Sequence, residues 1–150
     1  METTVRSRQV RLFISGQWRD ASDGKAFDQV SPATGQVIGV VSDATRDDAR
    51  AAVDAANRAR HSSALLPILE RAALCHRIAE TIAARQAQLA PELSLEQGKP
   101  LHEAIDEINF AAQLFSDAAD YISKLETSML PSAAGKRIFT LRQPHGVSPC

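Results

Sequence analysis

The chain lacks the features that mark a membrane, secreted or nucleic-acid-binding protein. It has no run of 18 or more apolar residues, so we expect no membrane-spanning helix. Two cysteines in 150 residues are too few for a disulfide framework and favour a reducing cytoplasm. The 17 basic and 18 acidic residues leave a net charge of -1, without the basic excess that binding to a phosphate backbone requires. A cytoplasmic protein without a nucleic-acid partner is the resulting expectation.

Aromatic residues are also scarce, at 5% of the chain, so a core has to be built from alanine, leucine, isoleucine and valine. The hydrophobic share of 44% and the charged share of 23% are typical of globular proteins. Residues 1–11 are polar and lack an apolar stretch before Leu12, so they form no secretory signal. We interpret them as a disordered tail, with an organelle-import leader as the alternative, and residues 12–150 as one segment.

Short apolar runs separated by turn residues predict strands at both ends of the chain. The first two runs, 12–14 and 17–19, flank Ser15 and Gly16 and predict a hairpin. Strands are also predicted at 27–30 and 37–41, joined by the turn 31–35, and a late strand is predicted at 138–141.

Helical patterns fill the middle of the chain. Thr45 and Asp48 have the spacing of a capping box and predict a helix that ends near 61–63. A second helix is expected to begin near Pro67. Pro91 is expected to break or kink the chain that continues from Gln86, which leaves a short third helix at 91–97.

Gly98 is placed to end the third helix, and Pro100 to begin a fourth of about six turns. The order of strands, four helices and a strand argues for an α/β or α+β fold, and we assign α/β, with strands too few and too scattered to close a sheet by themselves. Apolar residues recur at spacings of three and four in three of the helices. They are Ala49, Ala52, Val53, Ala56 and Ala59 in the first, Ile68, Ala72, Cys75, Ala79 and Ile82 in the second, and Leu101, Ile105, Ile108, Ala112, Phe115, Ala119 and Ile122 in the fourth.

The residues alone reveal no catalytic or metal site. The histidines at 61, 76, 102 and 145 lack zinc-ligand spacing. Cys75 lies on an apolar stripe and is interpreted as a buried hydrophobe, and Cys150 is the last residue, a poor position for a nucleophile. No GxGxxG or P-loop motif offers a phosphate cradle. The carboxylates of the fourth helix are interpreted as a solvated face rather than an acid–base pair: Glu103, Asp106, Glu107, Asp117 and Asp120.

Two further features of the helices have competing interpretations. Lys99 directly follows a predicted helix end, where a capping or ion-pair role is the default expectation. Phe110 and Leu114, with Phe115, either pack in a core or line an apolar ligand tunnel.

Residues 96–100 read Glu-Gln-Gly-Lys-Pro and follow a helix rich in alanine and leucine. With the segments 13–18, 31–39, 51–59 and 131–147, in that order, they resemble the N-terminal part of the NAD(P)-dependent aldehyde dehydrogenase superfamily. The closest likeness is to the succinate-semialdehyde dehydrogenase group. Ser31, where asparagine is common, and Pro91, inside a usually unbroken helix, depart from the family pattern.

The resemblance implies an oxidoreductase that converts an aldehyde to a carboxylic acid through a thiohemiacetal on a cysteine and hydride transfer to NAD or NADP. The family's catalytic cysteine, general-base glutamate and oxyanion asparagine lie beyond the matched segment, so no residue here takes a catalytic or cofactor-binding role. The resemblance gives Glu96, Gly98, Lys99 and Pro100 a structural role, and it places Phe110 and Leu114 on the helix that lines the aldehyde tunnel.

Two hypotheses follow from this resemblance. In the first, the chain is a fragment of an aldehyde dehydrogenase, inactive and without bound cofactor alone, whose partner is the missing C-terminal part. In the second, it is an interaction module that associates with full-length homologous subunits. Either way we expect the stripes of the second and fourth helices, which the family covers with its nucleotide-binding sheet, to be exposed and to promote association.

Overall fold

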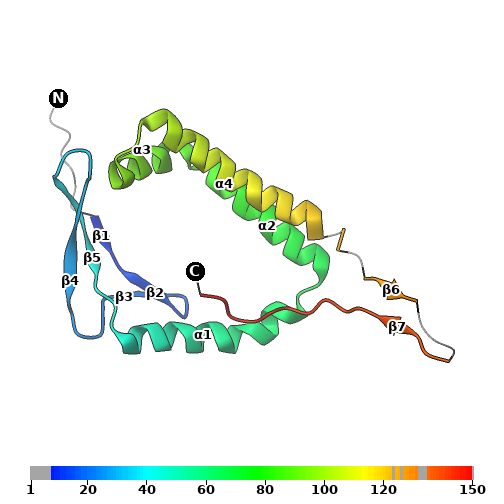
Figure 1. Cartoon of the computed structure of the whole chain (residues 1–150). Coiled ribbons are helices and arrows are strands. Elements are labelled where there is room, and N and C mark those ends of the chain that lie inside the picture. The colour runs from blue at the N-terminus through cyan, green and yellow to red at the C-terminus, as the bar shows by residue number, and fades with distance from the viewer. Residues whose placement is uncertain (1–7, 123, 126, 132–134, 150) are drawn as a thin grey trace.

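The computed structural model describes residues 8–122, 124–125, 127–131 and 135–149, and these form four helices and seven short strands. Figure 1 shows an open arrangement, with a small sheet at one end, a layer of three helices above α1, and a hairpin that projects away from the rest. The observed architecture combines four helices with short strands in small, incomplete sheets, as the sequence predicted.

A three-stranded sheet has the order β1-β5-β4, from β1 (Arg8–Val10), β5 (Val37–Ser42) and β4 (Ala26–Val30). β4 and β5 are antiparallel, with an irregularity between Gln29 and Val30. β1 runs parallel to β5, with Val10 opposite Val41. The sequence analysis left residues 1–11 without regular structure, so the strand at Arg8–Val10 is a correction, while residues 1–7 lie outside the described residues. Backbone pairing with β5 orders these polar residues although they lack an apolar pattern.

The predicted hairpin is confirmed as β2 (Leu12–Ile14) and β3 (Gln17–Arg19), which pair with Phe13 opposite Trp18. Ser15 and Gly16 both have positive φ, 55° and 77°, as the tight turns of two-residue hairpins require. The Phe13 and Trp18 rings lie 4.8 Å apart, an aromatic cross-strand pair that stabilises the hairpin.

Helix α1 (Arg46–Leu65) begins at the predicted cap, Thr45, but continues past the predicted end at 61–63. Its predicted apolar face is not a core face, since Ala49, Val53 and Ala56 are exposed. The one buried residue of α1 is Asp48. Alanine spacing indicated a helix here, but the contacts that hold it are polar.

Helices α2 (Ile68–Ala84) and α3 (Gln86–Gln97) are separated at Arg85, whose φ of -102° and ψ of 6° depart from helical values. The predicted break at Pro91 is therefore wrong, because Pro91 lies inside α3. A proline there removes one N–H donor, and α3 continues with one backbone hydrogen bond fewer.

Helix α4 (Leu101–Ile122) packs along α2 and against α3. The buried residues of α2 and α4 are alanines, whereas three members of the predicted stripes, Ile68, Leu101 and Phe115, are exposed. The buried alanines are Ala79, Ala104, Ala112 and Ala119. The expectation that these stripes would be exposed is thus wrong for the part of each stripe where α2 and α4 pack together, and it holds for Ile68, Leu101 and Phe115. The exposed apolar side chains of these helices lie mainly on other faces, among them Leu69, Leu74, Phe110, Leu114 and Tyr121.

The chain then forms a hairpin of β6 (Met129–Leu130) and β7 (Ile138–Phe139), so the late strand is shorter than the predicted 138–141. Figure 1 shows this hairpin projecting from the molecule and the following segment returning along α1. Both strands are exposed. No helix in the described residues is long and apolar enough to cross a membrane.

Candidate functional site

The corner between α3 and α4 is built by the Glu-Gln-Gly-Lys-Pro segment. Gly98 has the left-handed φ of 71°, and its N–H donates to the Ser94 carbonyl at 2.9 Å, which ends α3. The Ser94 hydroxyl donates to the Lys99 carbonyl at 2.7 Å. The Pro100 carbonyl accepts from the Ala104 N–H in the first turn of α4. Both predicted roles, helix end at Gly98 and helix start at Pro100, are confirmed.

This corner lies directly against the turn at 31–35, the second segment of the family resemblance. A Cβ atom at Gly98 would be 2.9 Å from Pro32 Cγ and 3.2 Å from the Ala33 nitrogen. Ser31 is fully buried at this contact, and its backbone bonds to Gln36 and Gly35. Two motifs that are distant in sequence therefore pack against each other where the sheet meets the helices.

The charged residues of this corner, Lys99 and Glu96, lie at its surface. The Lys99 ammonium forms an ion pair with Glu107 of α4, and its side chain is 20% exposed. Glu96 is exposed near the end of α3. Lys99 therefore has the predicted ion-pair role, and the geometry assigns no chemistry to the segment 96–100 beyond holding α3 and α4.

Phe110 and Leu114 lie on an exposed face of α4, with exposed fractions of 62% and 52%. Tyr121, further along the helix, is 68% exposed. Core packing within the described chain, one of the two sequence interpretations, is therefore wrong for Phe110 and Leu114. A tunnel-lining role stays a prediction.

A second polar cluster fixes the start of α1. Asp48, only 2% exposed, accepts hydrogen bonds from the backbone N–H groups of Ser22 and Thr45, both at 3.0 Å. Its other oxygen accepts from Arg19 of β3 at 2.9 Å. The hydrogen bonds from Ser22, then those from Thr45, hold the pKa of this carboxyl well below its usual range. Sequence reasoning found the Thr45–Asp48 pair but missed Arg19 and Ser22, which only folding brings near.

Helix N-termini attract phosphates, so the start of α1, at the junction that follows β5, is one position where a dinucleotide pyrophosphate can be tested against the residues present. Here the junction carries the carboxylates of Asp43, Asp47 and Asp48, and no glycine lies in it. Acidic side chains at this position repel a pyrophosphate, so the residues present do not fit NAD or NADP at this junction.

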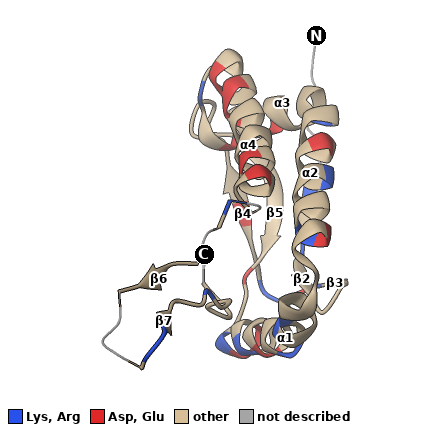
Figure 2. Ribbon diagram, turned by 90° about the vertical axis from the view of Figure 1, so that its right-hand side faces the viewer, with Lys and Arg blue, Asp and Glu red and all other residues tan. Residues whose placement is uncertain are grey.

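The acidic residues of α4 are spread along the helix rather than gathered in a pair (Figure 2). Glu107 pairs with Lys99, Asp117 accepts from Gln113 at 2.7 Å, and Asp120 lies 3.7 Å from His76 Nε2. Glu103 and Asp106 are exposed. Within the described residues this is the solvated helix face that the sequence predicted.

No cluster of three or more metal-ligating side chains occurs within the described ranges. Cys75 is a free, half-buried thiol on α2, and Cys150 lies outside the described residues. His102 is exposed in the first turn of α4. His61 and His145, scattered in sequence, are brought together and line one cavity.

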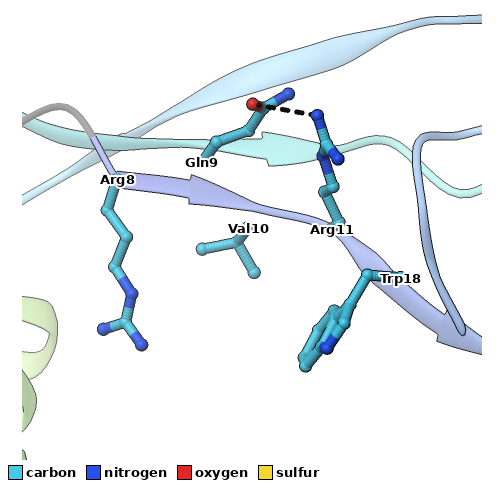
Figure 3. A pocket seen from close by; sticks show the side chains of 5 residues that line it. All are labelled: Arg8, Gln9, Val10, Arg11 and Trp18. Carbon is cyan, nitrogen blue, oxygen red and sulfur yellow. Dashed lines mark hydrogen bonds between the residues drawn. The ribbon is translucent and has the colours of Figure 1, made fainter. Parts of the chain in front are cut away.

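A cavity of about 470 Å³ lies beside β1 and is lined by Arg8, Gln9, Val10, Arg11 and Trp18 (Figure 3). Arg8 forms an ion pair with Glu92, and Arg11 forms one with Asp20 at 3.1 Å. Figure 3 shows Arg11 directed toward Gln9, with which it shares a hydrogen bond, and away from Val10. Because both guanidinium groups are already neutralised, this cavity offers no free charge to a ligand.

Comparisons with known proteins support the family resemblance that the order of the motifs indicated. The family profile described as "Aldehyde dehydrogenase family" matches residues 18–150. The succinate-semialdehyde dehydrogenase [NADP(+)] of Escherichia coli is 38% identical over 139 residues, which are 92% of this chain and 29% of that protein. The chain thus spans less than a third of the length of this relative.

Solved structures give the same result. The NAD-dependent aldehyde dehydrogenase from Sinorhizobium meliloti superposes with a TM-score of 0.80 at 36% identity, over 86% of this chain and 26% of that one. Betaine aldehyde dehydrogenase from Staphylococcus aureus, solved in complex with NAD+, gives a TM-score of 0.78 at 28% identity, over 83% and 26% of the two chains.

Proposed function

We propose that this chain, which belongs to the aldehyde dehydrogenase family, acts as the N-terminal part of an NAD(P)-dependent oxidoreductase that converts an aldehyde to a carboxylic acid. Its relatives are more than three times as long as the segment they share with it. The catalytic cysteine, the general-base glutamate, the oxyanion asparagine and the cofactor site belong to the part of the family fold that follows this segment. The chain by itself is therefore inactive and binds no cofactor.

The family match carries the oxidoreductase part of this proposal, and the unburied surface of the chain carries the part that makes it one piece of a larger protein. Its accessible surface is 11850 Å², whereas a compact monomer of 16.2 kDa exposes about 7,500 Å². Obligate protein interfaces bury roughly 2,000–5,000 Å² or more counted over both partners, so the excess on this one chain is at least as large as one side of such an interface. Large apolar side chains on every helix contribute to it. A chain with this surface is completed by further protein packed against it.

Phe110 and Leu114 have a specific role in this completed enzyme. Their exposed apolar side chains lie one helical turn apart on α4, away from the alanine contacts with α2. An aldehyde carbon chain needs a water-poor, apolar path, and these two side chains supply one wall of it. Closing that path requires the protein that covers α4.

The test joins this chain to the remaining part of the Escherichia coli relative, at the end of the matched segment. We expect the purified fusion protein to oxidise succinate semialdehyde with NADP+, and the 150-residue chain to show no turnover. NADPH absorbance measures both, and the complete relative is the positive control. A fusion protein that folds and assembles like the relative but has no activity would contradict the proposed role.

Substitutions on α4 test the tunnel role in the active fusion protein. Phe110→Ala and Leu114→Ala each remove apolar contacts with the substrate, and we expect each to lower kcat/KM by about tenfold. Phe110→Leu and Leu114→Met keep an apolar wall and are expected to retain most of the activity. Equal activity of the alanine variants and the parent fusion protein would show that these residues do not line the path.

The β6–β7 hairpin supports a second candidate function, an interaction module for full-length subunits. Its strands project from the molecule, and Met129 and Phe139 are 76% and 60% exposed. Unpaired strand edges and apolar side chains of this kind pair readily with another chain. Mixing the 150-residue chain with a full-length homologue separates the two functions. An altered oligomer size by light scattering favours the module, and an unchanged size and activity contradict it.

A further inference from the structure

A cavity between α1 and the C-terminal segment gathers side chains that the sequence leaves far apart. It has a volume of about 320 Å³ and is lined by Arg60, His61 and Ala64 of α1 and by residues 143–146. Figure 1 shows the C-terminal segment passing along α1, which is how the two stretches meet. We name it the α1–tail cavity.

The polar side chains of the α1–tail cavity are hydrogen-bond donors: the guanidinium of Arg60, the imidazoles of His61 and His145, and the amide of Gln143. No carboxylate is among its lining residues. Within the described part of the chain, no hydrogen bond or ion pair to protein engages Arg60, His61 or His145. This differs from the β1 cavity, where Glu92 and Asp20 neutralise both arginines.

Such a donor set suits an oxyanion. A guanidinium binds two oxygens of a phosphate or carboxylate at once, and the imidazoles and the amide add donors from two separate stretches of chain. The carbonyl end of α1 disfavours an anion, and Ala64 of the last turn lines the cavity, so the anion is expected on the Arg60 side, where this effect has fallen off. All of the residues that line the cavity are exposed, so a phosphoryl or carboxylate group can reach these donors directly from solvent.

We propose that the α1–tail cavity binds a small oxyanion, a phosphate or carboxylate group, with Arg60 as its main anchor and His61, Gln143 and His145 as further donors. The site is separate from α4 and from the aldehyde path, and it does not depend on the proposed oxidoreductase role. It is contained within the chain itself.

The test titrates the 150-residue chain with inorganic phosphate, and separately with acetate, at constant ionic strength. NMR signals of the His61 and His145 rings, assigned with His→Gln variants, report binding. We expect both rings to shift together along one saturating curve. Saturation by phosphate alone identifies a phosphate site, and saturation by acetate alone identifies a carboxylate site. No saturable shift with either anion overturns the proposal.

Matched charge variants distinguish a built site from general attraction. Arg60→Gln is expected to weaken binding by about tenfold, since it removes the bidentate anchor. Arg58→Gln removes the same charge from the same helix at a position outside the cavity, and we expect it to leave the affinity nearly unchanged. Circular dichroism verifies that both variants keep their helices. Equal weakening by the two substitutions shows an adventitious ion only, and overturns the proposal.

Discussion

Replacing Gly98 with alanine is expected to lower the free energy of unfolding by about 2–5 kcal/mol. Two costs add. The φ of 71° is unfavourable for any residue with a Cβ atom, by about 1–2 kcal/mol. The new Cβ would also lie 2.9 Å from Pro32 Cγ and 3.2 Å from the Ala33 nitrogen, and such overpacking costs about 1–3 kcal/mol. Urea denaturation followed by circular dichroism measures the loss.

Gly24 provides the matched control for this substitution. Its φ of 72° is nearly the same, but a Cβ atom there meets nothing within 4 Å. Gly24→Ala should therefore cost only the conformational part, about 1–2 kcal/mol. If both alanine variants lose the same stability, the close contact between residues 31–35 and the α3–α4 corner adds nothing to the cost of Gly98→Ala beyond backbone strain.

A second substitution, Pro32→Ala, measures the steric part of the cost of Gly98→Ala directly. In a Pro32→Ala background the nearest atom is gone, so Gly98→Ala should cost less than it does in the parent chain. This double-mutant comparison isolates the contact between the two motifs.

Replacing Asp48 with asparagine is expected to give the other large loss of stability. One carboxylate oxygen accepts from Ser22 and Thr45, and the other accepts from Arg19. An asparagine amide has a single acceptor oxygen. Its NH₂ group therefore has to face either the donors of Ser22 and Thr45 or the donor of Arg19, and those hydrogen bonds are lost. The start of α1 then loses its connection to β3, and we expect a clearly lower denaturation midpoint at pH 7.

The Asp48 variant should also change the pH dependence of stability. The pKa of Asp48 is lowered in the folded state, so its contribution is fully present above the unfolded pKa of about 4. The contribution is lost as the pH falls further, toward the folded pKa. The difference between parent and Asp48→Asn is thus expected to be greatest above pH 5 and to shrink toward pH 2.

Asp47 is the matched control, because it is the neighbouring carboxylate in the first turn of α1. Its side chain is 81% exposed and pairs with Arg50, an arrangement that contributes little. Asp47→Asn should shift the midpoint only slightly and leave the pH profile unchanged. If Asp48→Asn has no greater effect than this control, the buried cluster does not hold α1.

Local chemistry made much of the fold predictable. The Thr45–Asp48 spacing located the start of α1, and Ser15-Gly16 located the first hairpin, because caps and tight turns depend on a few adjacent residues. The helix end at Gly98 follows the same logic. The family motifs were equally local, and the match over residues 18–150 confirms them.

Other features depend on residues that are distant in sequence. β1 was missed because its order comes from pairing with β5, although Gly39 signals a close backbone approach: a Cβ there would lie 2.9 Å from the Arg8 carbonyl oxygen. The break between α2 and α3 falls at Arg85 rather than Pro91, and arginine is not a residue type that indicates the end of a helix.

The sequence by itself determined the family, the helix and turn boundaries that caps specify, and the position of Phe110 and Leu114 on one helix. Only the tertiary structure decided that α2 and α4 pack together, that Gly98 lies against Pro32, and that His61 and His145 line one cavity. The physical reason is the distance along the chain over which each kind of interaction acts. Capping and turn formation act over a few bonds, whereas burial and charge pairing depend on which surfaces the folded chain brings into contact.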